Sequence, residues 1–175
     1  MRRRASLSKK VGGTMIIVSA CLLGLNAKYD GTTNTQALLQ KYSSSEKFIP
    51  VCPEQLGGLP TPRVSAEIIE GTGQDVLLGR CVVQGEQGEV VTPQFIQGAK
   101  EVLKIVRMTK VTAAILKERS PSCGVNYIYD GSFSHCKIPG QGVTAALLKE
   151  HNIPIYSEVG LTEECLVGLL GDVDE

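Results

Sequence analysis

The sequence predicts an α/β fold: a single domain with a mainly parallel, Rossmann-like sheet flanked by helices and a β-hairpin excursion around residues 64–92. Short apolar runs rich in β-branched residues alternate with segments of helical periodicity, as in the β-α-β units that build parallel sheets. The 175 residues, 42% of them hydrophobic, suffice for one domain with its own core. Glycine-rich turns at 71–73 and 85–88 interrupt the alternation and indicate the hairpin.

The individual elements follow from local signals. Buried apolar runs predict strands at 15–20, 47–51, 111–116 and 153–156. Helical spacing of apolar residues predicts helices at 33–42, 93–110, 142–151 and 162–170, with Pro93 in a first turn and Thr162 as an N-cap. Residues 127–138 are expected to be irregular. The segment Val51–Arg63, with three prolines and two glycines, is expected to be a rigid loop that is neither helix nor strand.

Charge and the N-terminus restrict the partners and the location. Eighteen basic and eighteen acidic residues cancel, so the composition does not favour binding to nucleic acid or to an anionic membrane. No run of apolar residues is long enough to span a membrane. Residues 1–14 are expected to be a disordered basic extension before the domain at 15–175. The apolar run Met15–Val18 is shorter than the roughly 7–15 residues of a signal peptide, so a cytoplasmic location is expected.

Three of the six cysteines share one sequence context: Cys21, Cys52 and Cys123 each follow a predicted strand and lie beside glycine or proline. Because the carboxyl ends of parallel strands meet at one edge of a sheet, we expect their thiols to converge there. The absence of a C-x-x-C pair argues against zinc knuckles, thioredoxin-type centres and ferredoxin-type runs. Three converging thiolates suit a 4Fe-4S cluster with one open iron, a Lewis acid, whereas the alternative is that they are ordinary buried cysteines.

Two polar residues accompany these cysteines. Glu54 lies two residues after Cys52, where a carboxylate can act as a proton donor or base, although loop acids are often merely solvated. Ser120 precedes Cys123 by three residues, and its hydroxyl can orient a substrate or relay a proton. A serine-hydrolase role is disfavoured because the chain has no G-x-S-x-G motif.

Four motifs together resemble one family. They read S-A-C-L-L-G at 19–24, C-P-E-Q-L-G-G-L-P-T-P-R at 52–63, K-E-R-S-P-S-C-G at 117–124 and G-Q-G-V-T-A-A-L-L at 140–148. Their order and spacing are similar to the bacterial thiouracil desulfidase family over about residues 15–158, apart from Lys28 and Ser65, which depart from its pattern. The resemblance implies that Cys21, Cys52 and Cys123 hold a 4Fe-4S cluster whose fourth iron takes sulfur from a pyrimidine thiocarbonyl. It also implies that Glu54 and Ser120 are the polar catalytic pair.

The expected activity is therefore an iron–sulfur-dependent desulfidase that removes sulfur from thiouracil or a thiouridine nucleotide. The reaction is Lewis-acid-assisted hydrolysis without electron transfer, and it releases sulfide together with uracil or its nucleotide. The alternative on the same three cysteines is a non-catalytic sensor or sulfur carrier. A third hypothesis is a cluster-free binding module with buried cysteines.

Weaker signals concern the substrate and the other cysteines. Residues 140–145 open a helix whose N-terminus can bind an anion such as a nucleotide phosphate, and Arg63 or Lys117 can assist, although lone basic residues are usually solvated. The other three cysteines are expected to be ordinary core or surface residues: Cys81, Cys136 and Cys165.

Overall fold

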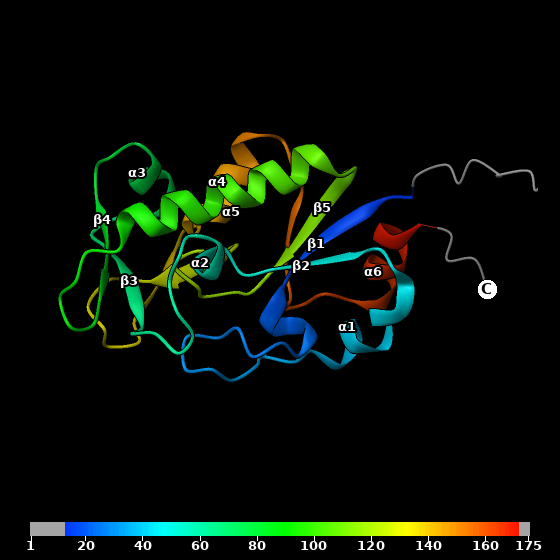
Figure 1. Cartoon of the computed structure of the whole chain (residues 1–175), viewed down its shortest axis with the longest axis horizontal. Coiled ribbons are helices and arrows are strands. Elements are labelled where there is room, and N and C mark those ends of the chain that lie inside the picture. Colours follow the sequence, from blue (N-terminus) through cyan, green and yellow to red (C-terminus); the bar gives the residue numbers. More distant parts are fainter. Residues whose placement is uncertain (1–12, 172–175) are drawn as a thin grey trace, which may run out of the picture.

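Four short strands form a parallel sheet at the centre of the computed structural model, which describes residues 13–171 (Figure 1). They are β1 (Met15–Ser19), β2 (Phe48–Val51), β5 (Val111–Leu116) and β8 (Ile155–Ser157). The order is β2-β1-β5-β8, with every neighbouring pair parallel. The chain therefore moves from β1 to β2 on one side and later adds β5 and β8 on the other. Such a change of direction creates a crevice at the carboxyl ends of the strands, here between β1 and β5.

Helices cover both faces of this sheet (Figure 1). The helices of the described chain are α1 (Ala37–Lys41), α2 (Pro53–Leu56), α3 (Gly73–Leu77), α4 (Thr92–Met108), α5 (Val143–Glu150) and α6 (Glu163–Leu170), with 3-10 turns η1 (Ala20–Leu23) and η2 (Ser43–Ser45). Of these, α2 and α3 pack against α4 and α5 and do not cover the sheet directly. Ile17 of β1 packs in the cluster with α4 and α5, whereas Ile16 and Val18 pack with α1 and α6. A strand buried on both faces is typical of a parallel α/β sheet, which confirms the predicted fold class.

The predicted hairpin excursion is present, but it contains a helix. β3 (Ala66–Ile69) and β4 (Val82–Gly85) pair antiparallel, and α3 lies between them. The predicted hairpin did not include this helix, which forms because Thr72 and Asp75 make a capping box that starts α3 and places Val76 in the core. The prediction that residues 127–138 are irregular was also wrong. It contains a second antiparallel pair, β6 (Tyr127–Tyr129) and β7 (Lys137–Pro139).

The proline-rich segment after β2 is not entirely a loop. Pro53 occupies the first turn of α2, with Cys52 as the N-cap residue, so one short helix begins where the sequence predicted none. This helix lies very close to α4. A Cβ atom added at Gly98 would lie 1.9 Å from the carbonyl oxygen of Pro53, and one added at Gly57 would lie 1.9 Å from that of Gln94. The two glycines therefore allow α4 to hold the Cys52 segment in place.

Other predicted elements match the structure closely. The strand at 111–116 has the predicted bounds, and α4, α5 and α6 fall within one or two residues of theirs, whereas α1 is shorter than expected. Thr162 caps α6, because its Oγ1 accepts a hydrogen bond from the Cys165 amide at 3.2 Å. Most of the predicted basic extension, residues 1–12, lies outside the described residues. Between residues 13 and 171, no helix is long and apolar enough to cross a membrane.

Candidate metal centre at the carboxyl edge of the sheet

Three cysteines from three strand ends line a single cavity of about 360 Å³. Cys21 lies in η1 directly after β1, Cys52 follows β2, and Cys123 lies in the loop after β5. The thiols of Cys21 and Cys52 are near enough to act electrostatically on that of Cys123. The structure thus brings the three predicted ligands together, although 102 residues separate the first from the last. Their role as ligands stays a prediction.

Burial governs the chemistry of these thiols. It raises the pKa of Cys123 to about 12, although hydrogen bonds from Ser122 and Ser19 act in the opposite direction. Burial also raises the pKa of Cys21 and of Cys52, against the lowering effect of their hydrogen bonds. Such thiols remain protonated at neutral pH in the absence of a metal, because the neighbouring hydrogen bonds and cations do not offset the effect of burial. A bound metal centre supplies positive charge and releases the protons.

The donor set fits an iron–sulfur cluster better than a single ion. In the described part of the chain, no three His, Cys, Asp or Glu side chains lie close enough together to hold one metal ion. A cluster differs because each thiolate binds a different iron, so its ligands stand farther apart. Thiolates are the soft ligands that iron–sulfur clusters use. A cavity of about 360 Å³ is at the lower end of the range of about 300–1,000 Å³ for small-molecule sites.

Glu54 and Arg63 form a buried ion pair beside Cys52. Arg63 Nε donates to Glu54 Oε2 at 2.5 Å, and the two side chains are only 6% and 14% exposed. The guanidinium also donates to the carbonyl oxygen of Ala27 at 3.0 Å and lies 3.8 Å from Cys52 Sγ. The expectation that Arg63 is solvated was therefore wrong. It fixes the carboxylate of Glu54 at the cavity wall and leaves Oε1 without a hydrogen bond from any other residue between 13 and 171.

Ser120 organises the turn that leads to Cys123. Its Oγ accepts hydrogen bonds from the amides of Ser122, at 3.2 Å, and Cys123, at 3.0 Å. Because both contacts use the oxygen as acceptor, the hydroxyl proton remains available for donation. Ser120 also lines the cavity. It can therefore position Cys123 and donate a hydrogen bond to a bound molecule.

The N-terminus of α5 supports the same turn and does not bind an anion. The amides of Val143 and Thr144 donate to the carbonyl oxygens of Pro121 and Ser122, each at 2.9 Å, and the Ala145 amide donates to Ser122 at 3.2 Å. These are the first-turn donors that an anion would need. The suggested phosphate site at residues 140–145 was therefore wrong, because the cysteine loop already occupies it.

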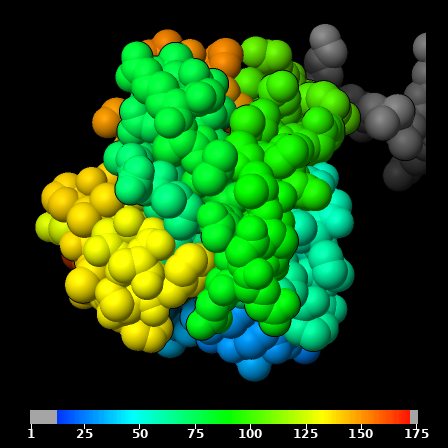
Figure 2. Space-filling view, turned by 90° about the vertical axis from the view of Figure 1, so that its left-hand side faces the viewer, coloured from blue at the N-terminus to red at the C-terminus, as the bar shows by residue number. Residues whose placement is uncertain are grey.

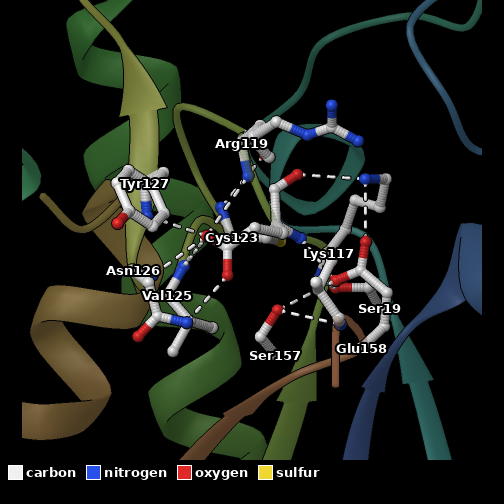
Figure 3. A network of polar contacts seen from close by, with 12 residues as sticks. Ser19, Lys117, Arg119, Cys123, Val125, Asn126, Tyr127, Ser157 and Glu158 are labelled. Atoms are coloured by element: carbon white, nitrogen blue, oxygen red, sulfur yellow. Dashed lines mark hydrogen bonds and ion pairs between the residues drawn. The ribbon is translucent and has the colours of Figure 1, made fainter. Parts of the chain in front are cut away.

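Glu118 organises the loop that carries Cys123, and the sequence reasoning did not single it out. Its buried carboxylate accepts hydrogen bonds at 2.9–3.0 Å from the amides of Val125, Asn126 and Tyr127 and from the Asn126 side chain. Figure 3 labels these three donor residues. Burial raises its pKa, but these bonds and one from Ser157 outweigh burial and lower the pKa to about 2. The carboxylate thus holds the loop that carries Ser120 and Cys123. The only sequence signal was its place in the K-E-R-S-P-S-C-G motif.

A second buried pair ties the strand ends together. Lys117 Nζ donates to Glu158 Oε1 at 2.8 Å, and the Glu118 amide donates to Glu158 Oε2 at 2.7 Å (Figure 3). The Lys117 amide donates to Ser19 Oγ at 2.9 Å. β1, β5 and β8 are therefore connected where the cavity begins. Lys117 is bound to Glu158 in this network and is not a solvated surface cation.

The remaining cysteines do not line the cavity. Cys81 lies beside the backbone of Thr72, Cys136 is exposed, and Cys165 is on α6. This placement agrees with the prediction that they are ordinary core or surface residues.

Comparisons with known proteins agree with one another. A family model described as 2-thiouracil desulfurase matches residues 16–159. The uncharacterized protein YbbK of Bacillus subtilis (strain 168) is 45% identical over 149 residues, which are 85% of this chain and 99% of YbbK. A solved structure of the 4Fe-4S-dependent thiouracil desulfidase TudS superimposes with a TM-score of 0.77 at 39% identity. That match covers 89% of this chain and 97% of TudS.

Proposed function

The chain belongs to the 2-thiouracil desulfurase family, and from that premise we propose that it is a 4Fe-4S-dependent desulfidase of thiolated pyrimidines. The observation that carries the proposal is the convergence of Cys21, Cys52 and Cys123 on one cavity. The likeness to TudS supports the same cofactor, because that enzyme is 4Fe-4S-dependent. The substrate is a small molecule, a thiouracil base or a thiouridine nucleotide.

The thiolates of Cys21, Cys52 and Cys123 would hold the cluster. When bound, the cluster supplies a Lewis acid that polarises the thiocarbonyl group. Glu54 accepts the proton of the attacking water at Oε1, while Arg63 keeps Oε2 in place. The Ser120 hydroxyl donates a hydrogen bond to the substrate. Water oxygen replaces sulfur, sulfur leaves as sulfide, and the ring carbon keeps its oxidation state, so no electron donor is required.

Metal analysis tests the cofactor and its ligands. Protein purified without oxygen is expected to contain iron and acid-labile sulfide, and replacement of any one of Cys21, Cys52 or Cys123 with Ser is expected to remove most of both. Cys165→Ser is the matched control and is expected to retain them, because Cys165 lies outside the cavity. Full iron content in one of the three variants would contradict the ligand assignment.

Turnover separates the enzyme from a sensor or sulfur carrier. The wild-type protein is expected to release sulfide from 2-thiouracil or 4-thiouracil, and the corresponding nucleotides show which substrate form is preferred. Glu54→Gln keeps a hydrogen-bond acceptor for Arg63 but removes the base, so kcat is expected to fall by about 10²–10⁴-fold with unchanged iron content. A coloured, iron-loaded wild-type protein without any turnover would instead favour the sensor.

The free state of all six cysteines agrees with a reducing environment, which supports the inferred cytoplasmic location.

A further inference from the structure

The two small sheets supply the outer wall of the cavity. β3 packs against β6, and four residues from these sheets and their loop line the cavity: Ala66, Glu67, Tyr129 and His135. The loop at 130–136 is the segment between β6 and β7. It lies in the yellow region at the surface on the side of the molecule shown in Figure 2.

Glu67 of β3 holds the loop at 130–136 through hydrogen bonds to its backbone. The residue is 7% exposed, and its Oε2 accepts hydrogen bonds from the amides of Gly131 and Phe133, both at 3.0 Å. Gly131 has a φ of 89°, and a Cβ atom there would lie 2.6 Å from the carbonyl oxygen of Ile68. The loop backbone therefore lies directly against β3. Because the Glu67 carboxylate accepts hydrogen bonds from two loop amides, it fixes the position of the loop backbone.

The anchored loop orients the Tyr129 ring. His135 contacts this ring edge-to-face, with ring centroids 5.9 Å apart and an interplanar angle of 75°. An edge-to-face contact uses at most one face of the Tyr129 ring. Tyr29 also lines the cavity, but Lys28 Nζ lies over its ring at 5.2 Å from the centroid, and the residue is 42% exposed. Tyr129 is therefore the half-buried aromatic side chain best placed to offer a ring face.

We infer that Tyr129 is a specificity-determining residue that stacks on the pyrimidine ring, with Glu67 and His135 as positioning residues. This inference rests on the proposed function, because it concerns the substrate of the same cavity. A flat pyrimidine ring presents a π-face that an aromatic side chain binds without reading its substituents. Stacking therefore selects a ring-borne thiocarbonyl over an acyclic one and holds the ring while the polar residues act on its sulfur-bearing carbon.

Kinetics of matched tyrosine variants test the stacking. Tyr129→Leu is expected to raise KM for thiouracil on the order of tenfold with kcat unchanged, because the lost contact forms in ground state and transition state alike. Tyr129→Phe keeps the ring and is expected to keep the wild-type KM. Tyr127→Leu is the control, since Tyr127 lies on the same strand but outside the cavity. An unchanged KM in Tyr129→Leu, or equal effects of the two leucine variants, overturns the inference.

The positioning role of Glu67 has a separate readout. Glu67→Ala removes the acceptor for both loop amides and is expected to raise KM as Tyr129→Leu does. Glu67→Gln keeps one acceptor oxygen and is expected to restore most of the affinity. Iron and sulfide content are measured in each variant, so that loss of the cluster is not mistaken for loss of substrate affinity. A fall in kcat at constant KM in Glu67→Ala would overturn the positioning role.

Binding of uracil, the desulfurised product, distinguishes failure of the inference from failure of the proposed function. Calorimetry on the iron-loaded protein is expected to show weaker uracil binding in Tyr129→Leu than in Tyr127→Leu. Absence of thiouracil turnover in the wild type contradicts the proposed function. Normal turnover with identical uracil affinity in both variants contradicts the stacking.

Discussion

Replacement of Glu118 by Gln is expected to destabilise the protein by removing the charge that organises the cysteine loop. Glu118 Oε1 accepts four backbone amides, three of them at 2.9–3.0 Å and that of Arg119 at 3.4 Å, and Oε2 accepts the Asn126 Nδ2 donor at 3.0 Å. A glutamine can serve the backbone amides with its oxygen, but its amide group then faces Asn126 Nδ2 as a second donor. The variant therefore loses both the charge and one hydrogen bond.

The shifted pKa gives the magnitude. The folded-state pKa of Glu118 is about 2, against an ordinary value of 4.5, and the residue is only 5% exposed. At about 1.4 kcal/mol for each pKa unit, the carboxylate contributes on the order of 3 kcal/mol to the free energy of unfolding at neutral pH. Because the folded pKa is lowered, this contribution is complete above pH 4.5 and is lost as the pH falls toward about 2.

Urea unfolding of iron-free protein, followed by circular dichroism from pH 7 to pH 3, measures this contribution. The wild type is expected to lose stability below pH 4.5 more steeply than Glu118→Gln, and the difference between them is expected to shrink as the pH falls. Glu101→Gln is the control, because Glu101 lies on the surface of α4, where its contacts with Lys104 and Gln97 contribute little. A difference that stays constant with pH, or is smaller than about 1 kcal/mol at pH 7, would refute the reasoning.

Three further predictions concern the supports of the cavity. Gly98→Ala places a Cβ atom 1.9 Å from a backbone oxygen of α2 and is expected to cost about 1–3 kcal/mol in urea unfolding, whereas Gly168→Ala, with open space around it, is expected to be neutral or stabilising. Arg63→Ala leaves its buried carboxylate partner uncompensated and is expected to cost about 3–5 kcal/mol by the same measurement. A cost below about 1 kcal/mol would show that this pair does not hold the segment. In iron-free protein at pH 8, iodoacetamide is expected to modify exposed Cys136 well before Cys123, whose pKa burial raises to about 12, and mass spectrometry of digested samples measures the order. Early modification of Cys123 would show that its loop opens readily.

The hydrophobic pattern of the sequence was sufficient to predict the helices and strands that bury a periodic apolar face. The apolar run at 111–116 and the amphipathic segment after Pro93 match β5 and α4, since burial of a periodic apolar face decides both. The prediction of secondary structure failed where hydrogen bonds between residues close in the sequence outweigh the hydrophobic pattern. The capping box at Thr72 produced a helix inside the expected hairpin, and the β6–β7 pair is too short for an alternating pattern to reveal.

The candidate site was partly predictable for the same reason. Each of Cys21, Cys52 and Cys123 follows a run that predicts a strand, and parallel strands share one carboxyl edge, so their convergence followed from sequence and topology. The partners of the polar residues were not predictable. Arg63 and Glu54 are nine residues apart, and Glu118 binds amides seven to nine residues away. Nothing in residue type distinguishes such acids and bases from solvated ones.

By itself, the sequence determined which residue types stand at the strand ends, because hydrophobic periodicity places strands and helices along the chain and the cysteines follow directly. Only the tertiary structure decided how those groups are used. Burial makes Arg63 and Lys117 ion-pair partners and not anion ligands, and packing assigns the first amides of α5 to the cysteine loop. The physical reason is that burial and hydrogen-bond pairing depend on neighbours brought from distant parts of the chain.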